Sequence, residues 1–254
     1  MEEATGEFRG FSDQVFRFLE RVEHRVAISP SEREAAFRLR CEAYRKIGFL
    51  TSDSIDKLYE SLFGDDPHGR TTTTFVDGEL AGTVRVNVGF DENAVLPGLQ
   101  AFADVLVPRL RDRQVIVEFT RLAARLSLSS VYPQLAYVIM RPAYMAAAFF
   151  DADFAVASPR AEHIAFYRRT FGAEMWCPPR DYPGLTAKLA CVAADYRGAR
   201  SRIEARYPFF KSTVAEREAL FGRRERKLTP FNPARAARGR DDALRLAVEL
   251  STCA

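Results

Sequence analysis

The chain has 254 residues, of which 47% are hydrophobic and 28% charged, a composition typical of a globular protein with a buried core. Its formal net charge of +3 does not favour nucleic-acid binding by the chain as a whole, and no apolar run reaches the roughly 18 residues that cross a bilayer. The charge is uneven, because residues 197–254 hold 14 Lys and Arg against 7 Asp and Glu, which suggests that this end meets an anionic partner.

The first half of the chain predicts helices followed by a hairpin. Residues 11–22 carry apolar side chains at helical spacing, and residues 24–29 resemble a short strand. Ser29 and Pro30 then form the start of a further helix, with a cap residue and a proline in the first turn. Residues 71–88 are two β-rich runs around Asp77-Gly78, a pair typical of a tight hairpin turn.

The second half alternates strands and helices. A short helix is expected after "VLPG". Strands are then expected at 114–123, 153–158 and 187–196. An apolar helix is expected at 131–150, and residues 161–176 should form a helix that ends at Gly172 and runs into a further strand. A basic, partly helical tail closes the chain. This order predicts an α+β protein with a central mixed β-sheet flanked by helices on both faces.

The stretch "VIVEFTRLAARLSL", residues 115–128, begins as a buried strand and is then interrupted by charges. Glu118 lies inside the expected strand and Arg121 near its end, and no glycine follows where the chain turns towards the next helix. The two charges would suit a structural ion pair inside a sheet. They would equally suit a site, because a carboxylate that is partly buried in a strand has a raised pKa.

Two segments resemble the GNAT acyltransferase fold. "FYRRTFGAEMW" is similar to the last helix and turn of that fold, and "FVDGELAGTVRV" is similar to its second and third strands. The resemblance covers about residues 24–196 and implies the acyl-CoA N-acyltransferase-like sheet. Ordinary members hold the CoA pyrophosphate on a glycine-rich turn after the fourth strand. Here "RLAARLSLSS" has no glycine, so this CoA clamp is missing or remade.

A narrower resemblance lies in "LRCEAYRKIGFL", "GTVRVNV", "LPG" and "VEFTRLA". These stretches are similar to long-chain N-acyl amino acid synthases, including N-acyl-tyrosine synthases, which are relatives of the acyl-homoserine-lactone autoinducer synthases. The resemblance implies transfer of a fatty acyl group from an acyl carrier protein to the α-amine of an amino acid, possibly tyrosine. We expect the acyltransferase domain at 1–210, including the helix at 11–22, and a basic extension at 211–254.

In this reaction Glu118 is the candidate base, because an attacking amine must lose a proton. Arg121 would either orient Glu118 or bind the carboxylate of the amino acid as a fork, and Arg40 and Arg85 are further candidates for that carboxylate. A backbone N–H near Thr120 to Leu122 would stabilise the oxyanion. Tyr44 and, more weakly, Asp66 beside Asp65 complete the expected substrate site.

The donor is expected to bind through its fatty chain and through its carrier. Each buried CH₂ contributes roughly 0.8 kcal/mol, so a long acyl chain can anchor the donor without a grip on CoA. The helix at 131–150 would form one wall of an acyl tunnel, with a groove at Ala146, Ala147 and Ala148 beside Phe149 and Phe150, or it is plain core. Arginines are the candidates for docking an acidic carrier protein, namely Arg125, Arg141, Arg160, Arg168, Arg169 and those of the tail.

No cofactor is expected. The three histidines are far apart in sequence, which predicts no metal site, and the four cysteines contain no CxxC pair. With no signal peptide in evidence, we expect free thiols in the cytoplasm and neither nucleic-acid binding nor membrane insertion. The alternatives are an autoinducer synthase that uses S-adenosylmethionine, against which the weak echo of the "RLLPT" signature counts, and a non-catalytic lipid- or partner-binding module.

Overall fold

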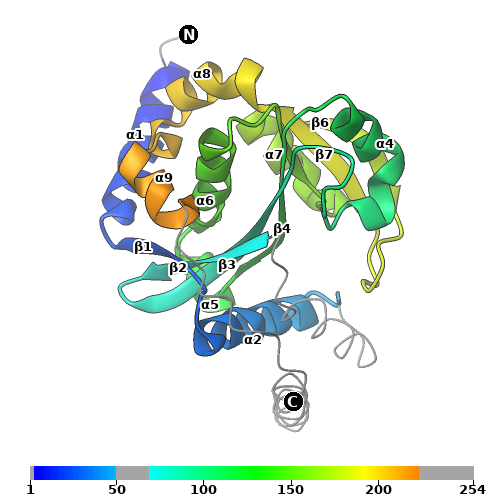
Figure 1. Ribbon diagram of the computed structural model, residues 1–254. Coiled ribbons are helices and arrows are strands. Elements are labelled where there is room, and N and C mark those ends of the chain that lie inside the picture. The colour runs from blue at the N-terminus through cyan, green and yellow to red at the C-terminus, as the bar shows by residue number, and fades with distance from the viewer. Residues whose placement is uncertain (1–2, 50–68, 223–254) are drawn as a thin grey trace, which may run out of the picture.

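The computed structural model describes residues 3–49 and 69–222, and in the first helix it describes side chains from residue 10 onward. Its centre is a seven-stranded sheet in the order β1-β2-β3-β4-β5-β7-β6 (Figure 1). The strands are β1 Val22–Val26, β2 Gly69–Val76, β3 Glu79–Gly89, β4 Ile116–Ala124, β5 Phe154–Ala157, β6 Glu174–Arg180 and β7 Leu189–Asp195. The β4–β5 pair is parallel and the other described pairs are antiparallel, so the predicted mixed sheet is confirmed.

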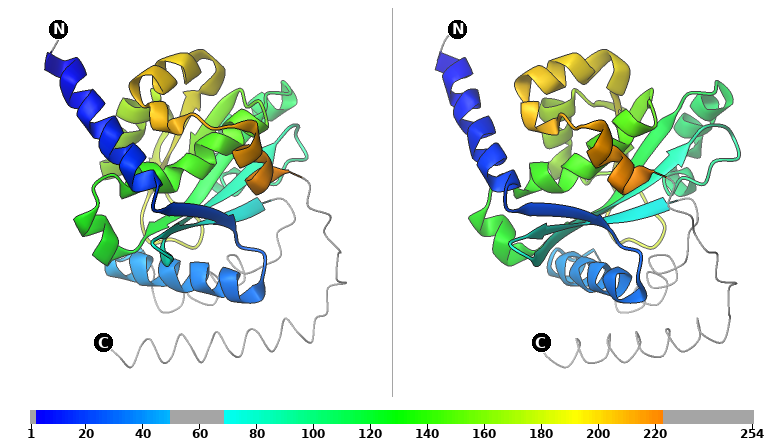
Figure 2. Two further views of the ribbon diagram at one scale, coloured as in Figure 1. Left: turned by 90° about the vertical axis from the view of Figure 1, so that its left-hand side faces the viewer. Right: turned by 60° about the vertical axis from the view of Figure 1, so that its left-hand side comes forward.

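Helices cover both faces of this sheet, as predicted. They are α1 Glu3–Leu19, α2 Pro30–Lys46, α4 Leu99–Arg111, α5 Leu126–Val131, α6 Leu135–Phe149, α7 Ile164–Phe171, α8 Tyr196–Arg206 and α9 Val214–Phe221. Helix α2 lies against one face, and α1, α6 and α9 lie on the other (Figures 1 and 2). Each face has its own apolar core, one centred on α6 and the other between α2, α4 and the sheet.

The start of α2 follows directly from its sequence. The Ser29 hydroxyl accepts a hydrogen bond from the backbone of Glu32, and the Glu32 carboxylate accepts one from the backbone of Ser29 at 2.8 Å. This capping box satisfies N–H groups that have no partner inside a helix, and Pro30 fits the first turn. The helix is therefore fixed at its first residue, and its buried face delivers Arg40 and Tyr44 to the sheet.

Strand β4 contains an irregularity that shapes the centre of the sheet. Thr83 pairs with Ala123 but Arg85 pairs with Thr120, so β4 has one residue more than β3 over this interval, which is a β-bulge. Arg121 sits in the bulge with φ of 56°, a left-handed conformation that few residues other than glycine adopt. The charge that interrupts the sequence pattern therefore marks a real kink within the strand.

Strands β4 and β5 part just before the bulge. Their parallel pairing runs from Ile116 opposite Phe154 to Phe119 opposite Ala157, where β5 ends. Beyond Phe119, β4 continues to Ala124 in register with β3 alone. An opening between two central strands thus begins beside Glu118.

The segment 207–222, which includes the described start of the C-terminal extension, packs onto α6. Phe209, Phe210, Leu220 and Phe221 are all buried in the α6 core. Arg141 of α6 holds this segment by three hydrogen bonds, to the backbone carbonyls of Phe209 and Lys211 (both 2.9 Å) and to the Glu216 carboxylate (2.8 Å). The expectation that Arg141 docks a carrier protein is wrong, because residues 207–221 cover it.

Across the described ranges, no helix has the length and apolarity needed to cross a membrane.

Candidate active site

Glu118 lies where β4 and β5 part, and its side chain has no exposed surface. Its Oε2 accepts a hydrogen bond from the backbone N–H of Gly98 at 3.1 Å, while Oε1 has no hydrogen-bond partner within the described part of the chain. Burial raises its pKa from 4.5 to about 7, although the Gly98 hydrogen bond and the charge of Arg121 oppose this shift. A carboxyl group that titrates near neutral pH can accept a proton from a bound amine and release it again.

A buried arginine, Arg40 of α2, lies on the same side of the sheet as this carboxylate. Arg40 is 1% exposed, and its Nη2 donates to the Thr83 hydroxyl at 2.8 Å and, at 3.5 Å, to that of Thr71. Within residues 3–49 and 69–222 no carboxylate forms an ion pair with it. Burial lowers its pKa to about 9, and the charges of Arg121 and Arg85 add to this effect. Buried cations in mutual range favour a bound anion.

Strand pairing brings the remaining predicted residues of β3 and β4 together. Arg85 lies opposite Thr120, and Asn87 lies opposite Glu118. The Arg85 Nε donates to the Asn87 side-chain oxygen at 3.2 Å, and both residues are buried on the face that α2 and α4 cover. Val84 and Val86 point to the opposite face, as the alternation predicts. The polar row is therefore continuous across two strands.

Two tyrosines border this polar row. Tyr44 of α2 is buried and its hydroxyl lies 3.5 Å from the carbonyl oxygen of Leu122, which follows the bulge. Tyr182, between β6 and β7, has its pKa raised by burial and then by the negative charge of Glu118. Tyr44 was expected from the sequence. Tyr182 was not, because nothing in "RDYPGL" distinguishes it from an ordinary turn.

Some unsatisfied polar atoms lie where β4 and β5 part. Among the described residues, buried side-chain atoms without a hydrogen-bond partner include Glu118 Oε1 and Thr120 Oγ1 of β4 and Ser158 Oγ just after β5, while others, such as His24 Nε2 and Arg40 Nε, lie elsewhere. Native interiors leave few such atoms, so their presence on both sides of one opening indicates a binding position for a polar ligand. Ser158 directly follows β5 and Arg160 lies two residues further on, and no pattern in the sequence pointed to a role for Ser158.

The face opposite Glu118 carries aromatic side chains where β4 and β5 part. Tyr167 of α7 stacks on Phe119, with ring centroids 6.0 Å apart, on the face opposite Glu118. Burial raises the pKa of the Tyr167 hydroxyl, and the neighbouring Tyr44 hydroxyl raises it further. Tyr44 comes from the α2 face, so the electrostatic effect of its hydroxyl reaches a tyrosine on the other face of the sheet. Tyr167 was identified in the sequence as part of a fold motif and not as a site residue.

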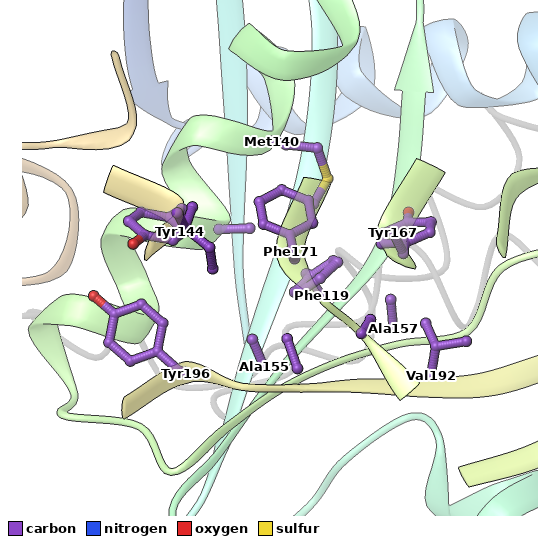
Figure 3. A pocket seen from close by; sticks show the side chains of 13 residues that line it. Phe119, Met140, Tyr144, Ala155, Ala157, Tyr167, Phe171, Val192 and Tyr196 are labelled. Carbon is purple, nitrogen blue, oxygen red and sulfur yellow. The ribbon is translucent and has the colours of Figure 1, made fainter. Parts of the chain in front are cut away.

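An apolar cavity of about 20 Å³ lies on the α6 face of the opening (Figure 3). Tyr167 and Val192 lie at one end, Phe119 lies near the centre, and Tyr144 and Tyr196 lie at the other end. Helix 131–150 does line a cavity, but through Met140, Ala143 and Tyr144. The expected groove residues Ala146, Ala147, Ala148, Phe149 and Phe150 do not line it, because the helix turns them into neighbouring parts of the core.

The other sequence expectations concern the surface, metals and thiols. Asp65 and Asp66 lie outside the described residues. Arg125 pairs with Glu79 and Arg160 with Glu162. Arg168 and Arg169 are exposed on α7 and make no ion pair with the described residues.

Where the structure is described, no group of His, Cys, Asp and Glu could hold a metal ion, and the three described cysteines are free thiols.

The seven-stranded mixed sheet with helices on both faces has the fold of a solved N-acyl amino acid synthase. The family model described as "N-acyl amino acid synthase FeeM" matches residues 35–195. The chain belongs to this family and is an acyltransferase, which confirms the resemblance found in the sequence.

Among solved structures, the chain is similar to FeeM, an N-acyl amino acid synthase from uncultured soil microbes. The identity is 22% and the TM-score 0.61, over 74% of this chain and 98% of FeeM. A putative N-acetyltransferase from Lactobacillus plantarum (15% identity, TM-score 0.45, 68% and 97% coverage) and a GNAT-family acetyltransferase from Staphylococcus aureus Mu50 (8%, 0.46, 68% and 98%) are more distant. No curated protein matches the chain by sequence.

Proposed function

We propose that this protein transfers a long-chain fatty acyl group from an acyl carrier protein thioester to the α-amine of an amino acid, with tyrosine as the first acceptor to test. The observation that carries the proposal is the position of Glu118. A carboxyl group with a pKa of about 7 lies within range of the charge of Arg121, which also acts on the buried Arg40. It lies where β4 and β5 part, and its neighbour in sequence, Phe119, lines an apolar cavity.

The acceptor would bind on the face covered by α2. Arg40 is a buried cation that makes hydrogen bonds to hydroxyl groups, and a substrate carboxylate would give it a charged partner. Arg121 and Arg85 contribute positive charge to the same position. With its carboxylate held there, the amino acid would present its amine to the unpartnered Oε1 of Glu118.

The chemistry follows from these positions. The amine nitrogen attacks the thioester carbonyl carbon while Glu118 accepts a proton from the nitrogen. The oxyanion that forms would be stabilised by a backbone N–H of the bulge, between Thr120 and Leu122, where β4 departs from regular pairing. The carbon–sulfur bond then breaks. The thiolate takes a proton from the Tyr167 hydroxyl or from protonated Glu118, and the products are an amide and a free thiol.

The donor would place its acyl chain in the cavity beside α6. The cavity is lined almost wholly by apolar side chains, which suits a hydrocarbon chain. Helix α5, which follows the glycine-free turn, has six residues and no glycine, so a pyrophosphate clamp of the usual kind is absent there. Arg168 and Arg169 remain exposed cations that suit an acidic carrier protein. We place the reaction in the cytoplasm, where free thiols persist.

The test begins with expression in a bacterium and mass spectrometry of an organic extract. A ladder of masses equal to fatty acid plus one amino acid minus water, absent with Glu118→Gln, supports the proposal. Purified protein is then given acyl carrier protein or CoA thioesters of the same chain, with tyrosine, tyrosinamide and each other amino acid. Equal rates with tyrosine and tyrosinamide would contradict carboxylate recognition. A lactone product formed only with S-adenosylmethionine would instead indicate an autoinducer synthase.

A further inference from the structure

We propose that Tyr144 and Tyr196 form the closed end of the acyl cavity and so set the upper limit of acyl chain length. This inference rests on the proposed function. It concerns which thioesters the site accepts and identifies residues that act on specificity without touching the reacting atoms.

The cavity has a direction that the strand register defines. Phe119, next to Glu118, lies opposite Ala157, and Ala157 lies opposite Val192. Two residues further along the strands, Ala155 lies opposite Ala194 on the same face. Tyr196 follows Ala194 by two more residues and starts α8. At about 3.3 Å per residue, Val192 and Tyr196 are roughly 13 Å apart along the strand direction.

Figure 3 shows the same order in space. Tyr167 and Val192 lie at one end, Phe119 near the centre, and Tyr144 and Tyr196 together at the far end. A thioester carbonyl beside Glu118 would therefore direct its hydrocarbon chain towards the two tyrosines.

The side chains that line this path differ in how easily they can move. The sheet contributes alanines, at positions 155, 157 and 194, whose small side chains leave space above the strands. Met140 of α6 faces them with an unbranched, flexible side chain. A cavity of about 20 Å³ holds roughly one water-sized sphere, so an acyl chain must displace lining side chains as it enters. Met140 is suited to such movement.

The far end is held more firmly. The rings of Tyr144 and Tyr196 meet edge to face, with centroids 5.3 Å apart. The Tyr144 hydroxyl lies 3.4 Å from the Glu204 carboxylate, which accepts a hydrogen bond from Arg200 Nε at 2.8 Å. Phe210 packs against the Tyr144 ring at 5.0 Å. Moving Tyr144 aside would break these contacts and leave Glu204 facing an apolar space, so a chain that reaches this end meets a fixed barrier.

The experiment measures product distribution in a competition. Wild-type protein and variants receive an equimolar mixture of saturated acyl carrier protein thioesters of increasing length, and the N-acyl products are quantified by mass spectrometry. Tyr196→Leu and Tyr144→Leu should shift the distribution to longer chains, by roughly fourfold for each further CH₂ that becomes buried. Ala194→Val should shift it to shorter chains, because it narrows the path.

Two controls keep the outcome interpretable. Tyr196→Phe retains the ring and should retain the wild-type distribution. Tyr137→Leu removes an aromatic ring from the same helix α6, where it packs on Phe166 and Phe209 away from the cavity, and should not change chain preference. An unchanged distribution in folded Leu variants and in Ala194→Val would overturn the inference. If wild-type protein forms no N-acyl amino acid, the proposed function itself fails, which is a different result.

Discussion

The backbone N–H of Gly98 donates a hydrogen bond to Oε2 of Glu118 at 3.1 Å, and a side chain at position 98 would have to displace the carboxylate of Glu118. A Cβ atom there would lie 2.6 Å from Oε1 of the same carboxylate. The residue before α4 thus both stabilises the buried carboxylate and sets where its free oxygen lies.

Gly98→Ala should therefore lower turnover while leaving the fold intact. The φ of Gly98 is −63°, which alanine adopts without strain, so the substitution acts through displacement of Oε1. We expect kcat to fall by at least about tenfold, because a base must lie within hydrogen-bond reach of its proton. Gly10→Ala is the control, since a Cβ at Gly10 meets nothing within 4 Å. Equal kcat in both variants would show that the position of Oε1 does not matter.

Glu118→Gln should reduce kcat by about 10²-fold or more, with little change in thermal stability at neutral pH. In the wild-type protein, the rate should rise with pH up to about 7, because only the ionised carboxylate accepts a proton and the pKa of Glu118 is about 7. The measurement is kcat against pH with a saturating donor. The glutamine variant should lose this limb, and a profile that it shares with the wild-type protein would assign the limb to another group.

The same pKa predicts how the free energy of unfolding varies with pH. Between pH 4.5 and about 7, the folded protein retains a proton on Glu118 that the unfolded chain has lost. This contribution to stability is present in full below pH 4.5 and is lost as the pH rises through about 7. Glu118→Gln lacks it, so the stability of the variant relative to the wild-type protein should increase over this interval. Urea titrations at pH 4.5, 6 and 8 test this, and a constant difference would contradict burial of the carboxyl group.

Substitution by methionine should affect the free energy of unfolding differently at two buried arginines. Arg141→Met removes a cation that pairs with Glu216 and holds residues 207–221, so we expect a loss of about 3–5 kcal/mol in the free energy of unfolding. Arg40→Met removes a buried cation that has hydroxyl partners, so stability should change little or increase. The KM for the amino acid should instead rise about 10- to 100-fold, as expected for a lost charged hydrogen bond.

The measurements for this pair are thermal unfolding and initial rates against amino acid concentration. A destabilised Arg40→Met protein with an unchanged KM would show that Arg40 has a structural role. Tyrosinamide provides a further check, because a substrate without a carboxylate should bind equally well to the wild-type protein and to Arg40→Met.

Features that depend on neighbouring residues could be predicted from the sequence. The Asp77-Gly78 turn has φ values of 49° and 82°, as a tight hairpin requires, and the Ser29 cap depends on a residue three positions away. The alternation around Arg85 placed it correctly on the face opposite Val84. Each of these features is determined by residues that are close together in the sequence, largely independently of the rest of the fold.

The candidate site could be predicted only in part, because its contacts are between distant segments. The site residues of β3 and β4 were expected to lie near one another, because β3 belongs to the predicted hairpin and β4 carries the family motif. The contact between Gly98 and Glu118 joins an unremarkable loop to a strand, and the electrostatic effect of Tyr44 on Tyr167 joins helices on opposite faces of the sheet. Arg141 was misassigned because its charge suggested exposure, whereas its burial depends on a segment about 70 residues later.

Glu118 and Phe119 are consecutive residues, so their side chains leave the sheet in opposite directions. One enters a polar, cationic compartment and the other lines a hydrocarbon one. A molecule with a charged head group and a hydrocarbon tail would have to extend from one face of the sheet to the other, with its amide bond at the gap just beyond the end of β5. Strand β5 is four residues long, so the partition between the two compartments stops there. A longer β5 would close the passage and leave both halves of the site intact but unable to share a substrate.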